Sequence, residues 1–279
     1  MHELNPRHRE AVRYLDGPLL ELAGAGSGKT RVITAKIAPL IEQAGVAARH
    51  ITAVTFTNKA AREMKERVGH LLGAEASRGL SISTFHTLGL NILRRELEAA
   101  GLRRGFSILD EQDVEQLLRE LGKRDEADRD TLQRARWRIS TWKNELIEPD
   151  AAMAQAEDDL DAYYAALYGA YQRALRAYNA VDFDDLILLP VKLLETNPAL
   201  RERWQNRIRY LLVDEYQDTN GAQYALVRLL VGVRAALTVV GDDDQSIYAW
   251  RGARPENLAR LREDYPRLRV IKLEQNYRS

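Results

Sequence analysis

Residues 23–30 (AGAGSGKT) have the composition and spacing of a loop that binds phosphate. The glycines in it can adopt backbone angles that a Cβ atom forbids, so successive N–H groups can point at phosphate oxygens. Lys29 would reach the terminal phosphates, and the hydroxyl of Thr30 would bind Mg²⁺. The predicted nucleotide-binding positions in this segment are Ala23, Gly24, Ala25, Gly26, Ser27, Gly28, Lys29, Thr30 and Arg31.

The flanking segments decide between a phosphate site and a plain flexible turn. Ala23 stands where the common GxxxxGK[ST] pattern has glycine, so the strict pattern fails. The apolar run at residues 18–22 predicts a strand before the loop, and Val32, Ile33 and Ile37 have helical spacing after it. A phosphate loop requires this order of strand, turn and helix, and the helix N-terminus would face the anion. We therefore favour the phosphate loop.

Two acids follow a second apolar run, Leu211-Leu212-Val213, and form the pair Asp214-Glu215. A carboxylate at the end of such a strand helps to hold Mg²⁺ in phosphate-loop enzymes, which makes Asp214 the candidate metal ligand. Glu215 is the candidate general base that would deprotonate an attacking water. A pair of solvated acids opening a loop is the alternative, and the phosphate loop on the same predicted sheet argues against it.

A third apolar run leads into Gly241-Asp242-Asp243-Asp244-Gln245. The amide of Gln245 could sense a terminal phosphate because it both donates and accepts hydrogen bonds, although an Asp-rich turn taken alone is the simpler explanation. Tyr248, Trp250 and Arg251 follow at once. Aromatic residues interleaved with arginine suit stacking on the bases of a single strand, but such residues more often belong to a core.

The elements that must position these residues alternate between strands and helices. Strands are predicted at residues 18–22, 51–56, 81–83, 210–213, 237–240 and 270–273, and a helix is predicted at residues 59–68. Asn5 and Pro6 are predicted to cap and begin an N-terminal helix, and Pro39 to kink or shorten the helix after the phosphate loop. This alternation predicts an α/β fold with a parallel, doubly wound sheet.

A charged, helix-rich stretch interrupts the alternation. We therefore predict a first part of the α/β domain at residues 1–87, a helical insertion at 88–190 and a second part of the α/β domain at 191–279. The hydrophobic fraction of 45% suits a folded core, and equal numbers of basic and acidic residues (41 each) give no hint of a nucleic-acid partner. The chain has no cysteine and no apolar run that could span a membrane, which favours the cytoplasm.

Six segments in order resemble one protein family: AGAGSGKT, AVTFTNKAAREMKERV, STFHTLG, LLVDEYQDTN, VVGDDDQSIYAWRGA and LEQNYRS. Together they resemble the N-terminal half of superfamily-1 DNA helicases of the UvrD/PcrA/Rep group, and the Rep branch in particular, over essentially the whole chain. The resemblance implies a RecA-like domain that contains the phosphate loop, interrupted by a mostly helical subdomain. It also implies ATP and Mg²⁺ as cofactors.

The resemblance assigns roles to matched positions. Lys29, Glu215, Gln245 and Arg278 would be catalytic, with Gln245 contacting the γ-phosphate and Arg278 acting as an arginine finger. Thr30 and Asp214 would bind the metal, and Tyr277 would pack on adenine. His8 stands where the family's adenine-reading helix usually has glutamine, so it is either a nucleotide contact or a surface histidine.

The matched positions for single-stranded DNA are Phe56, Thr57, Asn58, Thr84, Phe85, His86, Phe183, Tyr248, Trp250 and Arg251. Phe183, in the segment DFDDL, is balanced between a DNA contact and a core aromatic.

The resemblance implies the motor half of an ATP-dependent 3′-to-5′ DNA helicase that acts in bacterial replication or repair. Its partners would be ATP, single-stranded DNA and single-strand/double-strand junctions, and it would work as a monomer or weak dimer in the bacterial cytoplasm. The family has a second RecA-like domain after LEQNYRS, so we expect this chain alone to be poorly active. The alternative is a nucleotide- and single-strand-binding module with little turnover, and a recombination-nuclease subunit ranks third.

Overall fold

The computed structural model describes residues 5–24, 29–242 and 256–273, without the side chains of residues 29 and 256–258. Contacts between Cα atoms divide the chain into two compact units. The first unit comprises residues 1–88, 197–220 and 227–279, and the second comprises residues 89–196 and 221–226. The sequence predicted an insertion at residues 88–190, a range that overlaps the second unit over most of its length.

The first unit contains a parallel sheet of six strands in the order β3-β2-β6-β7-β1-β8. The strands are β1 (Leu19–Ala23), β2 (Ile51–Thr55), β3 (Ser81–Thr84), β6 (Tyr210–Val213), β7 (Leu237–Asp242) and β8 (Arg269–Lys272). Five of them, β1, β2, β6, β7 and most of β3, are buried along their length, as expected when helices cover both faces of a sheet. The predicted α/β fold with a parallel sheet is confirmed.

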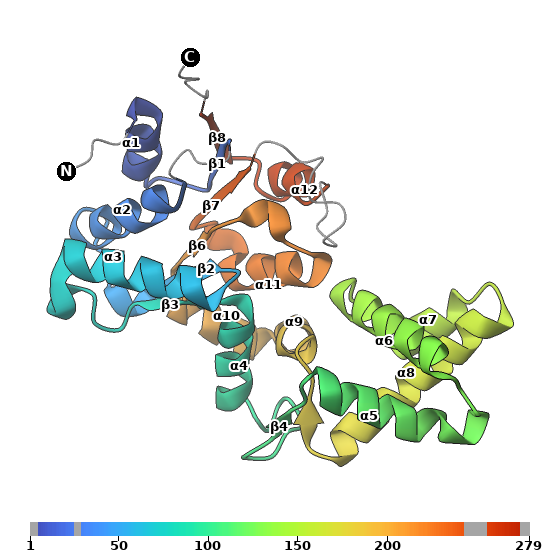
Figure 1. Cartoon of the computed structure of the whole chain (residues 1–279). Coiled ribbons are helices and arrows are strands. Elements are labelled where there is room, and N and C mark those ends of the chain that lie inside the picture. Colours follow the sequence, from blue (N-terminus) through green and yellow to red (C-terminus); the bar gives the residue numbers. More distant parts are fainter. Residues whose placement is uncertain (1–4, 25–28, 243–255, 274–279) are drawn as a thin grey trace. The chain divides into compact units, whose positions relative to one another are not determined.

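Helices of the first unit cover the sheet (Figure 1). They are α1 (Pro6–Arg13), α2 (Lys29–Glu42), α3 (Asn58–Ala76), α10 (Pro198–Arg207) and α12 (Glu256–Asp264), with α11 (Gly221–Val231) divided between the units. Apolar residues of α2 and α3 (Val32, Ile37, Met64) form a core with Leu19, Ile51 and Leu212 of the strands. This packing places α2 and α3 directly against the sheet that contains the phosphate-loop strand β1.

The helix ends follow local sequence signals. The side chain of Asn5 accepts a hydrogen bond from the N–H of Arg7, and Pro6 is the first residue of α1, as predicted. The helix that was predicted at residues 59–68 continues to Ala76, across a non-helical Gly73. Pro39 lies inside α2, which runs on to Glu42, so the proline shortens the helix little. Only one turn follows the proline, and that limits what its absent N–H costs.

The second unit is mostly helical. It contains most of α4 (Phe85–Arg95), then α5 (Glu111–Gly122), α6 (Arg129–Asn144), α7 (Pro149–Ala154), α8 (Asp159–Ala177) and α9 (Asp185–Thr196), with a two-strand ladder of β4 (Ser107–Ile108) and β5 (Ala180–Val181). Trp142 of α6 stacks on Tyr168 of α8 at 5.5 Å between ring centroids. The helices therefore close around an aromatic core of their own.

A buried ion network joins α6 to the start of α9. The ammonium of Lys143 donates to Asp182 at 2.7 Å and to Asp185 at 3.0 Å, and the hydroxyl of Tyr171 donates to Asp182 at 2.7 Å. The N–H of Asp185 also donates to the side chain of Asp182 at 2.9 Å. The first and last acids of DFDDL are thus structural. None of the described helices is long and apolar enough to cross a membrane.

Candidate functional site

The carboxyl ends of neighbouring strands bring the predicted nucleotide residues to one edge of the sheet. β1 pairs with β7, with Ala23 opposite Asp242, and β7 pairs with β6, the strand that leads into Asp214. In open parallel sheets this edge is where ligands bind. The strand order therefore assembles segments that are about 190 residues apart in the chain (23 against 214).

Thr30 and Asp214 meet at this edge. The Thr30 hydroxyl, in the first turn of α2, donates to a carboxylate oxygen of Asp214 at 3.3 Å. The other carboxylate oxygen accepts the N–H of Glu215 at 2.9 Å, and the N–H of Asp214 donates to the carbonyl of Val54 at 2.9 Å. Asp214 is buried. The two predicted metal ligands are therefore adjacent, and their oxygens suit a cation that takes few protein ligands and completes its shell with phosphate and water.

Glu215 is held in place by a residue that sequence reasoning missed. The backbone of Glu215 is left-handed (φ 51°), a conformation that residues other than glycine rarely adopt. The side-chain amide of Gln217 donates to the Glu215 carboxylate, while the Gln217 carbonyl accepts the N–H of Asp242 at 2.9 Å. Gln217 thus connects the candidate base after β6 to the end of β7. Its place in the matched segment LLVDEYQDTN was the available signal.

Several predicted site residues lie outside the part of the chain that the structure describes. They are Ala25, Gly26, Ser27, Gly28, Gln245, Tyr248, Trp250, Arg251, Tyr277 and Arg278, together with the side chain of Lys29. Ala23, Gly24 and Arg31, on either side of the loop, are described. Ala23 is buried at the end of β1, and Arg31 is exposed in the first turn of α2.

His8 corrects one expectation, because it is not a surface histidine. The residue is 5% exposed, and its Nδ1 lies 2.7 Å from Oε1 of Glu21, a fully buried residue in the middle of β1. Glu21 is an acid in a strand that was expected to be apolar, which signalled a buried partner. The sequence alone could not identify His8 as that partner, because it does not orient the loop between α1 and β1. His8 therefore faces the phosphate-loop strand.

The ends of β2 and β3 gather a second group of predicted residues, because Thr55 and Thr84 are opposite each other in the pairing. Phe56 packs on Phe85 at 5.3 Å between ring centroids, and Phe85 is itself 2% exposed. The hydroxyls of Thr57 and Thr84 accept N–H groups at the starts of α3 and α4, from Ala60 and Thr87. Asn58 is exposed, and burial lowers the pKa of His86. Phe85 thus supports the more accessible Phe56.

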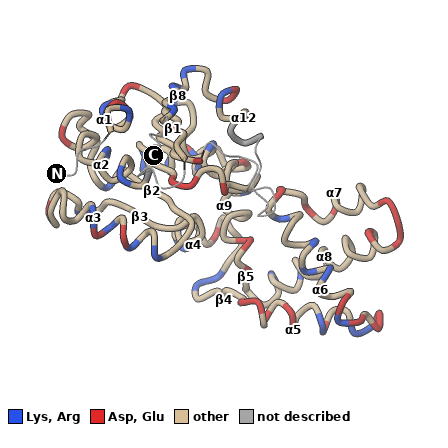
Figure 2. Tube along the Cα trace, turned by 45° about the horizontal axis from the view of Figure 1, so that its top comes forward, with Lys and Arg blue, Asp and Glu red and all other residues tan. Residues whose placement is uncertain are grey.

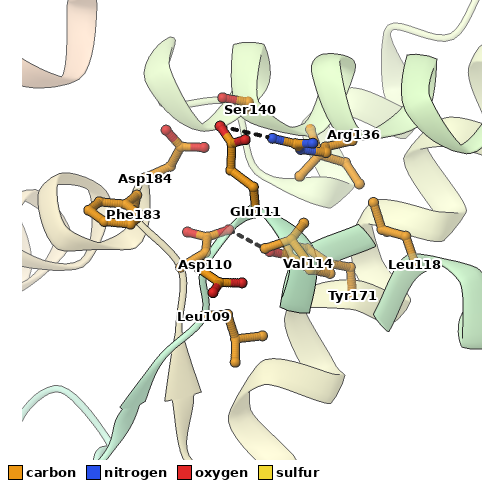
Figure 3. A pocket seen from close by; sticks show the side chains of 12 residues that line it. Leu109, Asp110, Glu111, Val114, Leu118, Arg136, Ser140, Tyr171, Phe183 and Asp184 are labelled. Atoms are coloured by element: carbon orange, nitrogen blue, oxygen red, sulfur yellow. Dashed lines mark hydrogen bonds and ion pairs between the residues drawn. The ribbon is translucent and has the colours of Figure 1, made fainter. Parts of the chain in front are cut away.

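Phe183 lies in the second unit and is 53% exposed, which argues against a core aromatic. It borders a pocket of about 360 Å³ between α5, α6 and the segment 182–184 (Figure 3). Arg136 in this pocket is paired with Glu111 at 3.3 Å and with Glu115 at 2.8 Å. Burial, and then the charge of Asp182, raise the pKa of Asp184 to about 6. The pocket combines an exposed ring with acidic side chains.

Charged residues are mixed along the elements that carry these groups. Figure 2 shows basic and acidic residues interspersed along α3, whose exposed charged residues between positions 59 and 67 are Lys59, Arg62, Lys65 and Arg67 with Glu63 and Glu66. This face has a small excess of basic charge. Any attraction for a polyanion must come from local groups, as the balanced composition indicates.

Comparison with known proteins identifies the family. The profile of the UvrD/REP helicase N-terminal domain matches residues 4–266. The chain is 61% identical over 277 residues to the ATP-dependent DNA helicase Rep of Escherichia coli, covering 99% of this chain and 41% of that protein. It is 47% identical over 278 residues to the ATP-dependent DNA helicase PcrA of Staphylococcus epidermidis, covering 99% of this chain and 38% of that protein.

The chain therefore spans about two fifths of the length of these relatives. The match runs through both compact units, including the buried network of the second. Together with the paired Thr30 and Asp214 at the carboxyl edge of a parallel sheet, it shows that this chain belongs to the UvrD/REP helicase N-terminal domain family.

Proposed function

We propose that this chain is the motor segment of an ATP-dependent 3′-to-5′ DNA helicase, which couples Mg-ATP hydrolysis to movement on single-stranded DNA. The observation that carries the proposal is the contact of Thr30 with Asp214 beside the phosphate-loop strand. The names of the relatives, ATP-dependent DNA helicases Rep and PcrA, support it.

In the proposed reaction Lys29 and the N–H groups of residues 24–30 bind the phosphates of ATP. Thr30 and Asp214 would hold Mg²⁺, which would supply positive charge to neutralise the outer phosphates. Glu215 accepts a proton from the attacking water, and Gln217 orients the Glu215 carboxylate through its amide. Gln245 and Arg278 contact the γ-phosphate, and Tyr277 packs on the adenine.

Single-stranded DNA is the proposed track. Phe56 is supported from beneath by Phe85, which gives a firm platform on which a base could stack. Thr57, Asn58, Thr84 and His86 adjoin these two rings in the sequence, and Tyr248, Trp250 and Arg251 are the further contacts that we propose. Phe183 offers a further exposed ring. Single-strand/double-strand junctions would be the substrates for unwinding.

The test is ATP hydrolysis by this chain with and without a single-stranded oligonucleotide, comparing wild type with Lys29→Ala. We expect this chain alone to hydrolyse ATP slowly. If it acts as a motor segment, hydrolysis rises with DNA and falls by at least about a hundredfold in Lys29→Ala, because the ammonium stabilises charge that develops in the transition state. Lys123→Ala, at an exposed lysine of the second unit, is the matched control and should hydrolyse ATP as wild type does.

The same assay distinguishes the alternative, a module that binds nucleotide and single-stranded DNA with little turnover. Lys29-dependent binding of Mg-nucleotide without turnover would support it. Binding that Lys29→Ala leaves intact would contradict both forms of the proposal.

We also propose that the protein works in the bacterial cytoplasm, in replication or repair, as a monomer or weak dimer. The relatives named above are bacterial proteins. Sedimentation across a range of protein concentrations, with and without a junction substrate, measures the oligomeric state.

A further inference from the structure

Three buried ionisable side chains meet on one side of the phosphate-loop strand. His8 of α1 is 5% exposed, whereas Glu21 of β1 and Lys36 of α2 are fully buried. Each comes from a different element: α1, then β1, which ends where the phosphate loop begins, and α2, which follows the loop (Figure 1). Burying a charge is costly unless an opposite charge accompanies it. The proposed reaction uses neither Glu21 nor Lys36, so their burial needs another explanation.

Glu21 makes its closest polar contact with His8. Nδ1 of the imidazole lies 2.7 Å from Oε1, an ion-pair distance, although the alignment falls short of a regular hydrogen bond. Two lone pairs at that distance would repel each other, so the proton lies on Nδ1. In the neutral ring Nε2 then carries a lone pair, because the hydrogen bond of one ring nitrogen sets the state of the other.

Lys36 of α2 also contacts α1. Its ammonium donates to the backbone carbonyl of Ala11 at 3.1 Å and lies 6.0 Å from the ring centroids of Tyr14 and Tyr210. Burial lowers the pKa of Lys36 to about 7, and the charge of Glu21 opposes that shift. Tyr210 stays neutral, because burial raises its pKa to about 12. Glu21 is therefore the counterion that the core offers Lys36.

We propose that Glu21 is a positioning residue of the nucleotide site. Its carboxylate fixes the proton of His8 on Nδ1 and, with Lys36, holds α1 against the strand that enters the phosphate loop. The inference rests on the proposed nucleotide binding, and it names the group that ties α1 to β1, the strand that precedes the phosphate loop. The nucleotide then binds a pre-organised wall, which costs less ordering entropy than closing a loose helix around it.

The first test reads the His8 proton directly and needs no nucleotide. Nitrogen-15 NMR of the whole chain at about pH 9, where an ordinary imidazole is neutral, should show the His8 proton on Nδ1. His8→Gln assigns the signal among the five histidines. In Glu21→Leu the share of His8 that carries its proton on Nδ1 should fall, because the carboxylate that favours this form is gone. A wild-type proton on Nε2 overturns the proposal.

The second test measures Mg-ATP affinity in Glu21→Leu/Lys36→Met, which replaces both buried charges by apolar side chains of similar size. Such replacements often leave a fold as stable or more stable, so a loss of affinity would not reflect unfolding. We expect affinity to fall by about fivefold or more, the usual lower end of coupling between linked sites. Thermal unfolding without nucleotide is the control. Affinity within about twofold of wild type overturns the proposal, because the coupling would then be negligible.

The two arms separate this inference from the proposed function. If wild type fails to bind Mg-ATP in a Lys29-dependent way, the proposed function fails, while the NMR arm still decides whether Glu21 sets the His8 proton. If wild type binds Mg-ATP and the double variant binds it equally well, only the positioning role of Glu21 fails.

Discussion

Each unit of the molecule buries a lysine completely, and the pKa values of the two lysines shift in opposite directions. Lys143 of the second unit contacts two carboxylates at 2.7 and 3.0 Å. Burial alone would lower its pKa, but the charges of Asp185 and Asp182 outweigh burial and raise it. Lys36 of the first unit donates to a backbone carbonyl, and burial lowers its pKa to about 7.

The difference shows that close partners, more than depth, decide whether a buried lysine stays charged. Burial also opposes the ionisation of Asp182, yet Lys143 and the hydroxyl of Tyr171 lower its pKa. The Lys143 network is thus a closed set of charges that supports the fold. At Lys36 the charge of Glu21 does not offset the cost of burial, so the protonation of Lys36 can change near neutral pH.

The largest effect is expected from Lys143→Met. Removing the ammonium leaves Asp182 and Asp185 buried and repelling each other, which should lower the free energy of unfolding by about 3–5 kcal/mol. Urea denaturation monitored by tryptophan fluorescence, to which Trp142 beside Lys143 contributes, measures this loss.

Lys192→Met provides the matched control. Lys192 pairs with Glu148, and the two side chains are 28% and 53% exposed. An exposed pair contributes at most about 1 kcal/mol, so this variant should unfold almost as wild type does. Equal losses in the two variants would mean that burial of the network has no special importance.

A smaller, pH-dependent effect is expected at Lys36. Its folded pKa of about 7 lies below the ordinary value of 10.5, so between these values the unfolded state binds more protons. Raising the pH therefore stabilises the fold, by at most about 1.4 kcal/mol per unit. Relative to Lys36→Met, wild type should gain up to about 2.7 kcal/mol between pH 7 and 9 in urea denaturation. A constant difference would show that Lys36 does not titrate there.

The smallest effect is expected at Asp184, which lies beside the Lys143 network without being enclosed by it. Its folded pKa of about 6 lies above the ordinary 3.8, so the folded state binds more protons between those values and stability falls as pH rises. Because the side chain retains some solvent contact, Asp184→Asn should gain only about 1 kcal/mol over wild type between pH 4 and 7. Denaturation at both pH values measures it, and Asp110→Asn, in the same pocket, is the comparison.

The sequence predicted the strands well because most of them are short runs of apolar or β-branched residues. Residues 210–213 were predicted to the residue, and the end of β1 differs from the prediction by one residue. Thr30 and Asp214 could be paired in advance, since carboxyl ends of parallel strands share one edge. Helix lengths were harder, because α3 continues through Gly73, which sequence rules treat as a stop.

Most of the contacts that sequence reasoning missed join distant segments of the chain. His8 and Glu21 are brought together by the way α1 folds back on β1, and Lys143 meets Asp182 and Asp185 about 40 residues later in the chain. Lys143, Asp182 and Asp185 each look like an ordinary surface residue when taken alone, whereas Glu21 stands out within an apolar run. Only the contacts in the folded structure show which of these charged side chains are buried together.

The strand order has a consequence for protein synthesis. β1 leaves the ribosome early, but both of its neighbours, β7 and β8, come from the last part of the chain. At about 5–20 residues per second, the roughly 250 residues between β1 and β8 take about 12–50 s to synthesise. Most of the second unit, residues 89–196, is made within that interval and depends on contacts within itself. We therefore expect it to fold first, while the phosphate-loop strand waits exposed, a natural client for chaperones until β8 emerges.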